Sequence, residues 1–131
     1  MNMIKTKSYF SSRWARISVL MALLMSSLSL MAHEFEVDGI YYKINGNKAA
    51  VTFRGSYSDS YDNEYSGSVV IPATVTYNGT TYPVTAIGAE AFWKCTGLTS
   101  IDIPNSVTAI GVIAFAECTG LTSIVVESGN P

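Results

Sequence analysis

Strict alternation of apolar and polar residues predicts two strands between residues 40 and 53. The segment 45–48 (NGNK) supplies the turn between them, so the two strands form a hairpin with one apolar face. That face needs a partner to cover it. The residues on it are Ile40, Tyr42, Ile44, Ala49, Val51 and Phe53.

A second pattern repeats itself at a fixed offset. The apolar and small residues of 84–101 return at 107–124, and 14 of the 18 positions are identical at an offset of 23. A period of this length is typical of a solenoid, in which each repeat forms one coil and buries its apolar positions against the next coil. We therefore predict stacked coils.

The geometry of one coil follows from the same alternation. Ile101 and Ile103 point inward along a strand that Pro104 ends, because proline has no N–H to donate. The segment 89–94 is predicted to form a short helical turn, with Ala91 and Phe92 inward. Gly88 and Gly111 are expected at a corner that leaves no room for a side chain.

The pair Asn78-Gly79 predicts a second hairpin, because both positions of a type I′ turn need positive φ. Its position explains why 71–76 resembles 103–108 at an offset of 32 rather than 23: the hairpin is an excursion within a modified first coil. Its apolar face is expected on the solenoid. The predicted pairs are Tyr77 with Thr80, Val75 with Tyr82, and Ala73 with Val84.

The first 32 residues have the pattern of a secretory signal peptide. A basic start precedes an apolar run over 17–30, which is short for a membrane span, and Ala32 offers a small residue for cleavage. The alternative is an amino-terminal membrane anchor. Export is the prediction, and a polar terminus is expected at His33, because a copper site there would need a second histidine and the sequence has one.

The charge balance changes once this segment is removed. From His33 onward, 4 Lys and Arg face 10 Asp and Glu, so the net charge is 4 − 10 = −6. Such a surface repels polyanions, which makes nucleic acid an unfavourable partner.

The segment 54–67 is polar, glycine-flanked and acidic, so it is predicted to be a surface loop. Candidate calcium ligands are present at Asp59, Asp62, Asn63 and Glu64, but their spacing does not match that of a calcium loop. The tyrosines in this loop could stack on a sugar, or simply pack the loop onto its own domain. They are Tyr57, Tyr61 and Tyr65.

Cys95 and Cys118 are separated by one repeat, so they occupy equivalent sites on adjacent coils. Their Cα–Cβ vectors are then parallel, which favours two free thiols over a disulfide. Two Cys and one His do not make a zinc site, and the sequence contains no nucleophile, phosphate-loop or paired-carboxylate motif. No metal, no cofactor and no enzymatic activity are expected.

The repeats resemble the BspA-type leucine-rich repeats of bacterial surface proteins. The resemblance rests on the pattern V-T-x-I-G-x-x-A-F-x-x-C-x-x-L-T-S-I, which occurs at 84–101 and again at 107–124, and on the leader-like block 39–88. It implies a mainly β, curved solenoid with stacked parallel strands, short helical turns and an N-terminal β-hairpin cap. It also implies export to the bacterial surface and adhesion to, or binding of, host or cell-surface macromolecules.

The predicted organisation is a signal peptide (1–32), a hairpin cap with the polar loop (33–67) and the solenoid (68–131). Within the solenoid, a modified first coil (68–97) precedes regular coils at 98–120 and 121–131. Two regular repeats are few for a solenoid, so we expect the sequence to be an amino-terminal part of a longer protein.

Stacking of the coils about 4.8 Å apart turns each outward position into a column. The outward sheet surface is the candidate ligand face, for which an inert sheet surface is the alternative. We expect a macromolecule, and a protein in particular, as the partner. A glycan bound by the tyrosine loop and a passive spacer role are the other hypotheses. The two columns are Ser68, Ser100 and Ser123, and Val70, Asp102 and Val125.

Overall fold

The computed structural model describes residues 32–59 and 63–130, so the predicted signal peptide lies outside the described residues except for Ala32. All described strands belong to one compact unit, Met31–Pro131. The described part of the chain has no helix of the length and hydropathy that a membrane span requires. The strands are β1 (Phe35–Val37), β2 (Ile40–Asn45), β3 (Lys48–Thr52), β4 (Gly67–Val70), β5 (Thr74–Tyr77), β6 (Thr80–Ile87), β7 (Leu98–Ile103), β8 (Ala109–Ile110) and β9 (Ser123–Val126).

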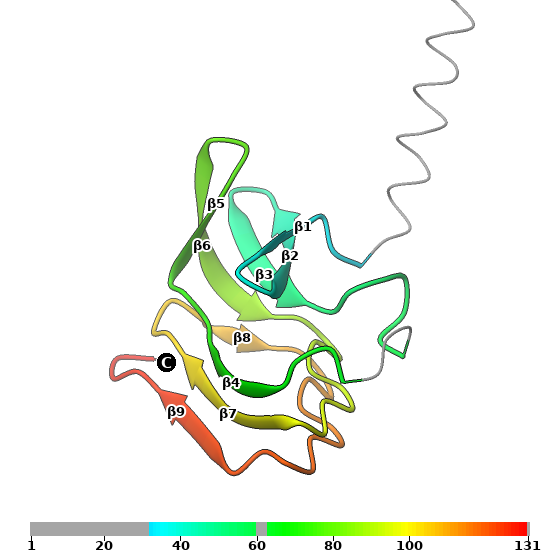
Figure 1. Ribbon diagram of the computed structural model, residues 1–131. Coiled ribbons are helices and arrows are strands. Elements are labelled where there is room, and N and C mark those ends of the chain that lie inside the picture. The colour runs from blue at the N-terminus through cyan, green and yellow to red at the C-terminus, as the bar shows by residue number, and fades with distance from the viewer. Residues whose placement is uncertain (1–31, 60–62, 131) are drawn as a thin grey trace, which may run out of the picture. The chain divides into compact units, whose positions relative to one another are not determined.

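The first hairpin is formed by β2 and β3, and the predicted shared face is confirmed, because Tyr42 lies opposite Val51 and Ile44 opposite Ala49; β3 ends at Thr52, one residue before Phe53. β3 then pairs in parallel with β6, and β6 pairs in parallel with β8. The hairpin thus extends one sheet of the solenoid at its N-terminal end (Figure 1). The cap is this extension, and it includes an edge strand, β1, that the sequence pattern did not predict.

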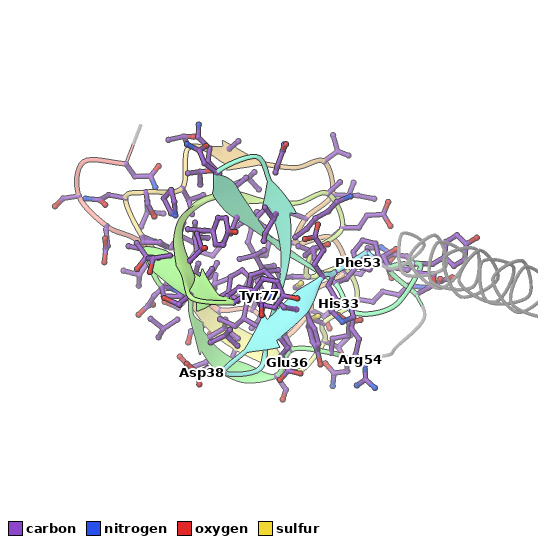
Figure 2. The ribbon with its side chains drawn as sticks, turned by 90° about the horizontal axis from the view of Figure 1, so that it is seen from above. His33, Glu36, Asp38, Phe53, Arg54 and Tyr77 are labelled. Carbon is purple, nitrogen blue, oxygen red and sulfur yellow. The ribbon has the colours of Figure 1, made fainter. Side chains whose placement is uncertain are left out.

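The second hairpin, β5 and β6, also has the predicted register, with Tyr77 opposite Thr80 and Val75 opposite Tyr82. Its aromatic face packs on β1: the ring of Tyr77, labelled in Figure 2, stacks on that of Phe35 with centroids 4.2 Å apart. The excursion therefore covers the cap as well as the first coil.

The second sheet consists of β4, β7 and β9, stacked in parallel (Figure 1). Ser68 lies opposite Ser100 and Ser100 opposite Ser123, so the offsets of 32 and 23 residues are both confirmed as one step of the stack. Ile101 lies opposite Ile124. Like residues therefore meet through the stack, as the sequence repeat predicts.

The turn segments that connect the two sheets are not helical, and the prediction of a short helical turn at 89–94 is wrong. Glu90 and Lys94 have positive φ, 58° and 55°, and the equivalent Ile113 and Glu117 repeat this. Trp93 N still donates locally, to Glu90 O.

Alternate amides of this segment reach the next coil instead. Phe92 N donates to Ala114 O over 2.8 Å, and Lys94 N donates to Ala116 O over 2.9 Å. Because hydrogen bonds between coils take these N–H groups, an α-helical ladder cannot form. The segment is a series of tight turns bonded sideways to its copy.

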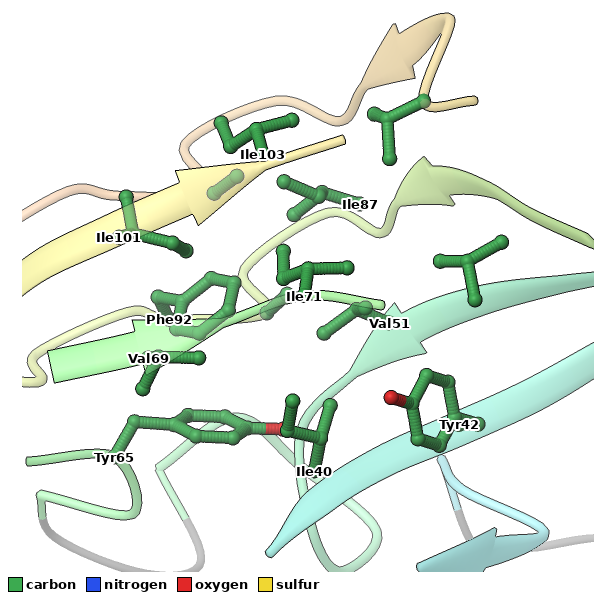
Figure 3. Close-up of a cluster of buried hydrophobic side chains, with 14 of the residues drawn as sticks. Ile40, Tyr42, Val51, Tyr65, Val69, Ile71, Ile87, Phe92, Ile101 and Ile103 are labelled. Carbon is green, nitrogen blue, oxygen red and sulfur yellow. The ribbon is translucent and has the colours of Figure 1, made fainter. Parts of the chain in front are cut away.

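The core lies between the two sheets and continues from coil to coil (Figure 3). Phe92 is fully buried, and its ring stacks on that of Phe115 with centroids 5.2 Å apart. Val69 and Ile71 face Val51 and Ile87 from the opposite sheet (Figure 3). Burial of about 25 cal/mol per Å² of apolar surface makes this continuous column the main stabilising contribution.

Candidate binding surface

The two predicted columns lie on the outer side of β4, β7 and β9, and we call these six residues the outward face. Register places Val70, Asp102 and Val125 side by side, and the three serines beside them. Ser100 Oγ donates to Ser68 Oγ over 2.8 Å, so two of the hydroxyls are tied together. Val70 is 62 % exposed and Val125 is 51 % exposed. The face thus combines hydroxyl groups, exposed methyl groups and one carboxylate.

This chemistry suits binding rather than bond breaking. Asp102 is the only charged residue of the outward face, and the neighbouring groups on its strand are serine and isoleucine. A nucleophile with an adjacent base, which hydrolytic chemistry requires, is not formed by these six residues. They offer hydrogen bonds and apolar contacts on a regular surface.

Further apolar side chains are exposed on the last described coil. Ile124 lies opposite Ile101 and Val126 lies opposite Ile103, so both continue the inward columns of the repeat. Each is nevertheless about half exposed, 53 % and 51 %, because no described strand lies beyond β9. Val112 in the turn segment is 74 % exposed, and the repeat pattern gave no sign of it because Ala89 occupies that position one coil earlier.

The tyrosine loop is not the common stacking surface that one hypothesis required. Tyr65 is only 3 % exposed; its hydroxyl donates to Thr52 O over 2.7 Å and accepts from Tyr41 N over 3.1 Å. Its ring packs on Phe92, with centroids 4.6 Å apart (Figure 3). Tyr65 is therefore a core residue, and the hypothesis that it stacks on a sugar is wrong. Tyr57 is 73 % exposed, and Tyr61 lies outside the described residues.

Two polar side chains of the same loop accept hydrogen bonds from backbone N–H groups. Asn63 Oδ1 accepts from Gly97 N over 2.8 Å, and the Glu64 carboxylate accepts from Arg54 N over 3.0 and 2.9 Å. Burial raises the pKa of Glu64, and the bond from Arg54 opposes that shift. Among the described residues, no group of three or more His, Cys, Asp or Glu could hold a metal ion.

His33 is attached to the domain rather than frayed. Its ring packs edge-on against Tyr41 with centroids 5.0 Å apart, and its Nδ1 accepts from Gly55 N over 3.4 Å. Burial, with the nearby Arg54 cation, lowers the pKa of His33. The expectation of a loose polar terminus is wrong for this residue.

Cys95 and Cys118 are both free, as predicted from their spacing. Cys118 Sγ donates to Phe92 O over 2.9 Å, so its S–H group is directed to the backbone of the previous coil. Burial raises the pKa of the Cys95 thiol to about 11 and that of Cys118 above its ordinary value. Both thiols are thus protonated, unreactive core groups at neutral pH.

A sequence model of the BspA-type leucine-rich repeat region, built of six copies, matches residues 58–130. The chain belongs to this family. A comparison with curated proteins found no match.

Solved structures of bacterial leucine-rich repeat proteins share the fold. A leucine-rich repeat protein from Bacteroides ovatus superposes with a TM-score of 0.62 at 30 % identity. The match covers 74 % of this chain and 24 % of the Bacteroides ovatus chain. A leucine-rich cell surface protein from Faecalibacterium prausnitzii gives a TM-score of 0.58, with the same identity and coverage. One from Bacteroides capillosus gives a TM-score of 0.57 at 30 % identity, covering 71 % of this chain and 64 % of its own. The chain therefore spans 24 % of the length of two of these relatives and 64 % of the third.

Proposed function

We propose that this chain is an exported, cell-surface leucine-rich repeat protein that binds a host or cell-surface protein through the outward face. The observation that carries the proposal is the in-register stacking of that face across β4, β7 and β9. Family membership and the similarity to a cell surface protein of Faecalibacterium prausnitzii support the location.

The chemistry of the outward face favours a protein partner. Exposed valines beside serine hydroxyls match the mixture of apolar contacts and hydrogen bonds found in protein interfaces. The charge of −6 from His33 onward disfavours nucleic acid. Catalysis forms no part of the proposal, because binding is all that the six residues offer.

A double substitution tests the proposal. The double substitution Ser100→Arg with Asp102→Arg places two large cations on β7, the middle strand of the sheet. The substitutions change side chains only and leave the backbone of β7 as it is. Because a bulky charged pair blocks close approach, binding to intact epithelial cells should fall at least tenfold. Flow cytometry of the labelled protein measures this, and circular dichroism checks that the variant folds.

The carbohydrate alternative has one observation in its favour, the 73 % exposure of Tyr57. Tyr57→Ala with Tyr61→Ala is the matched variant, tested on the same cells and on a glycan array. Loss of binding confined to this variant would transfer the function to the loop. If neither variant changes binding, neither the outward face nor the loop is the binding site, and a passive spacer role is favoured for both.

A further inference from the structure

A groove with a volume of about 620 Å³ runs along β4 on the side away from β7. Residues of β4 line it together with the turn between β1 and β2, whereas no residue of β7 does. On the opposite side of the solenoid the other sheet continues through β3, β2 and β1 (Figure 1). The three-stranded sheet ends at β4, so the groove occupies the place where a further strand would lie.

The edge of β4 presents backbone groups to this groove. Ile71 N donates to Asp102 O over 3.0 Å, while Val70 is the residue opposite Asp102. In a parallel ladder, residues bonded to one neighbour alternate with residues whose N–H and C=O face the other side. The N–H and C=O groups of Ser68 and Val70 therefore face the groove, and no described strand pairs with them.

The walls of the groove have a definite chemistry. Asp38, at the end of β1 (Figure 2), and Glu64 are its charged residues, and no described Lys, Arg or His lines it. Tyr42 also lines it, and the buried Tyr42 hydroxyl has no hydrogen-bond partner among the described residues. The rest of the lining is largely aliphatic: Val37, Ile40, Val69, Val70, Pro72 and Val75.

We propose that an extended segment of a partner protein, carrying lysine or arginine, adds as a strand to the free edge of β4. The groups of Ser68 and Val70 bond its backbone, the aliphatic wall receives its apolar side chains, and Asp38 and Glu64 attract its cations. A second copy of this chain fits less well, because its own charge of −6 from His33 onward is repelled by the same carboxylates. This site shares Ser68 and Val70 with the outward face, but it uses their backbone groups at the edge of the sheet, whereas the outward face uses side chains of β4, β7 and β9.

A random octapeptide library displayed on phage is the probe, selected on the immobilised protein. We expect recovered peptides to be rich in Lys and Arg and to alternate apolar and polar residues. Synthetic versions are then measured by fluorescence anisotropy, and amide chemical shifts locate the contact at Ser68 and Val70.

Two variants test the parts of the groove separately. Val70→Pro removes an N–H group at the edge of β4 while leaving the hydrogen bonds to β7 in place, and should weaken peptide binding at least tenfold. Its control, Val70→Ala, keeps the N–H group and should change peptide binding less than threefold. Asp38→Asn removes the charge but keeps a residue type that tolerates the positive φ of 52° at this position. It should weaken the binding of cationic peptides, whereas the remote Glu117→Gln should leave that binding unchanged.

Several outcomes would overturn the proposal. No enrichment over a blank surface would do so, as would peptides that bind Val70→Pro and Val70→Ala equally. Selected peptides without cationic residues would remove the role of Asp38. Maltoheptaose shifting the Ser68 and Val70 amides, with no peptide doing so, would assign the groove to a glycan instead. Because the Ser100→Arg/Asp102→Arg variant leaves the groove intact, failure of the outward face would not disturb these results.

Discussion

At the scale of single residues, two buried tyrosines differ in the hydrogen bonding of their hydroxyl groups. The Tyr65 hydroxyl is bonded to Thr52 O and Tyr41 N, whereas the Tyr42 hydroxyl has no partner in the described structure. Leaving a buried polar group unbonded costs free energy, and so does removing one half of a satisfied pair. Tyr42 and Tyr65 therefore make a matched test of the polar contacts.

We predict that Tyr65→Phe lowers the free energy of unfolding by about 1–3 kcal/mol, because Tyr41 N loses its acceptor. Tyr42→Phe should leave it unchanged or raise it by up to about 1 kcal/mol, since no bond is lost. Urea denaturation of both variants measures the difference. Equal losses would show that the Tyr42 hydroxyl has a partner after all.

The thiols give a pH-dependent prediction. Burial raises the pKa of Cys95 from 9.0 to about 11, so the folded protein holds this proton more tightly than the unfolded chain does. Its contribution to stability is present in full below pH 9 and is lost as the pH rises through about 11. The stability difference between wild type and Cys95→Ala should therefore narrow over that range. A constant difference in urea midpoints from pH 8 to 11 would contradict it.

Alkylation tests the same residues without a pH series. Iodoacetamide added to the unreduced protein in guanidinium should add two groups by mass, because both cysteines are free. The native protein at pH 7.5 should react far more slowly, since both thiols are shielded and protonated. An unreduced, unfolded protein of unchanged mass would mean that the cysteines form a disulfide.

At the scale of elements, the corners of the coils decide how closely they stack. A Cβ on Gly111 would lie 2.2 Å from Ala89 N, in the backbone of the previous coil. Gly88 stands one coil earlier, and a Cβ there would lie 3.0 Å from Val51 O. Neither glycine has positive φ, so the requirement is for space rather than for a special backbone conformation.

We predict that Gly111→Ala lowers the free energy of unfolding by about 3 kcal/mol or more, because a backbone atom cannot move aside. Gly88→Ala should cost about 1 kcal/mol, since its contact is at the limit of tolerance. Thermal and urea unfolding of the two variants give the comparison. A milder effect at Gly111 than at Gly88 would contradict the close approach of the coils.

The elements also show where sequence reasoning succeeded and where it failed. The hairpin registers and the columns could be predicted because alternation and a fixed period determine which residues meet. The conformation of the turn segment at 89–94 could not be predicted, because its amides bond to the next coil. A short apolar pattern does not distinguish such a segment from a helical turn. Tyr65 was placed in a surface loop because its partners, Thr52 and Phe92, are distant in sequence.

At the scale of the whole molecule, the sequence predicted the outward face but not the groove beside β4. The face depends on one repeated strand, so its six residues could be read from their spacing. The groove depends on β1, β2 and β4 together, and on one sheet ending earlier than the other. Only the three-dimensional arrangement brings Asp38 and Glu64 to the same rim.

The proposed function requires that a protein partner contact the outward face. Replacing Val125 by the photo-crosslinking residue p-benzoyl-phenylalanine places the reactive group on the exposed side of β9, and the same replacement at Glu117 in the turn segment is the control. After irradiation on intact epithelial cells, mass spectrometry should identify one surface protein crosslinked from position 125 and absent from the control at position 117. Crosslinks of equal yield from both positions, or none from position 125 under conditions where the protein binds cells, would contradict the claim.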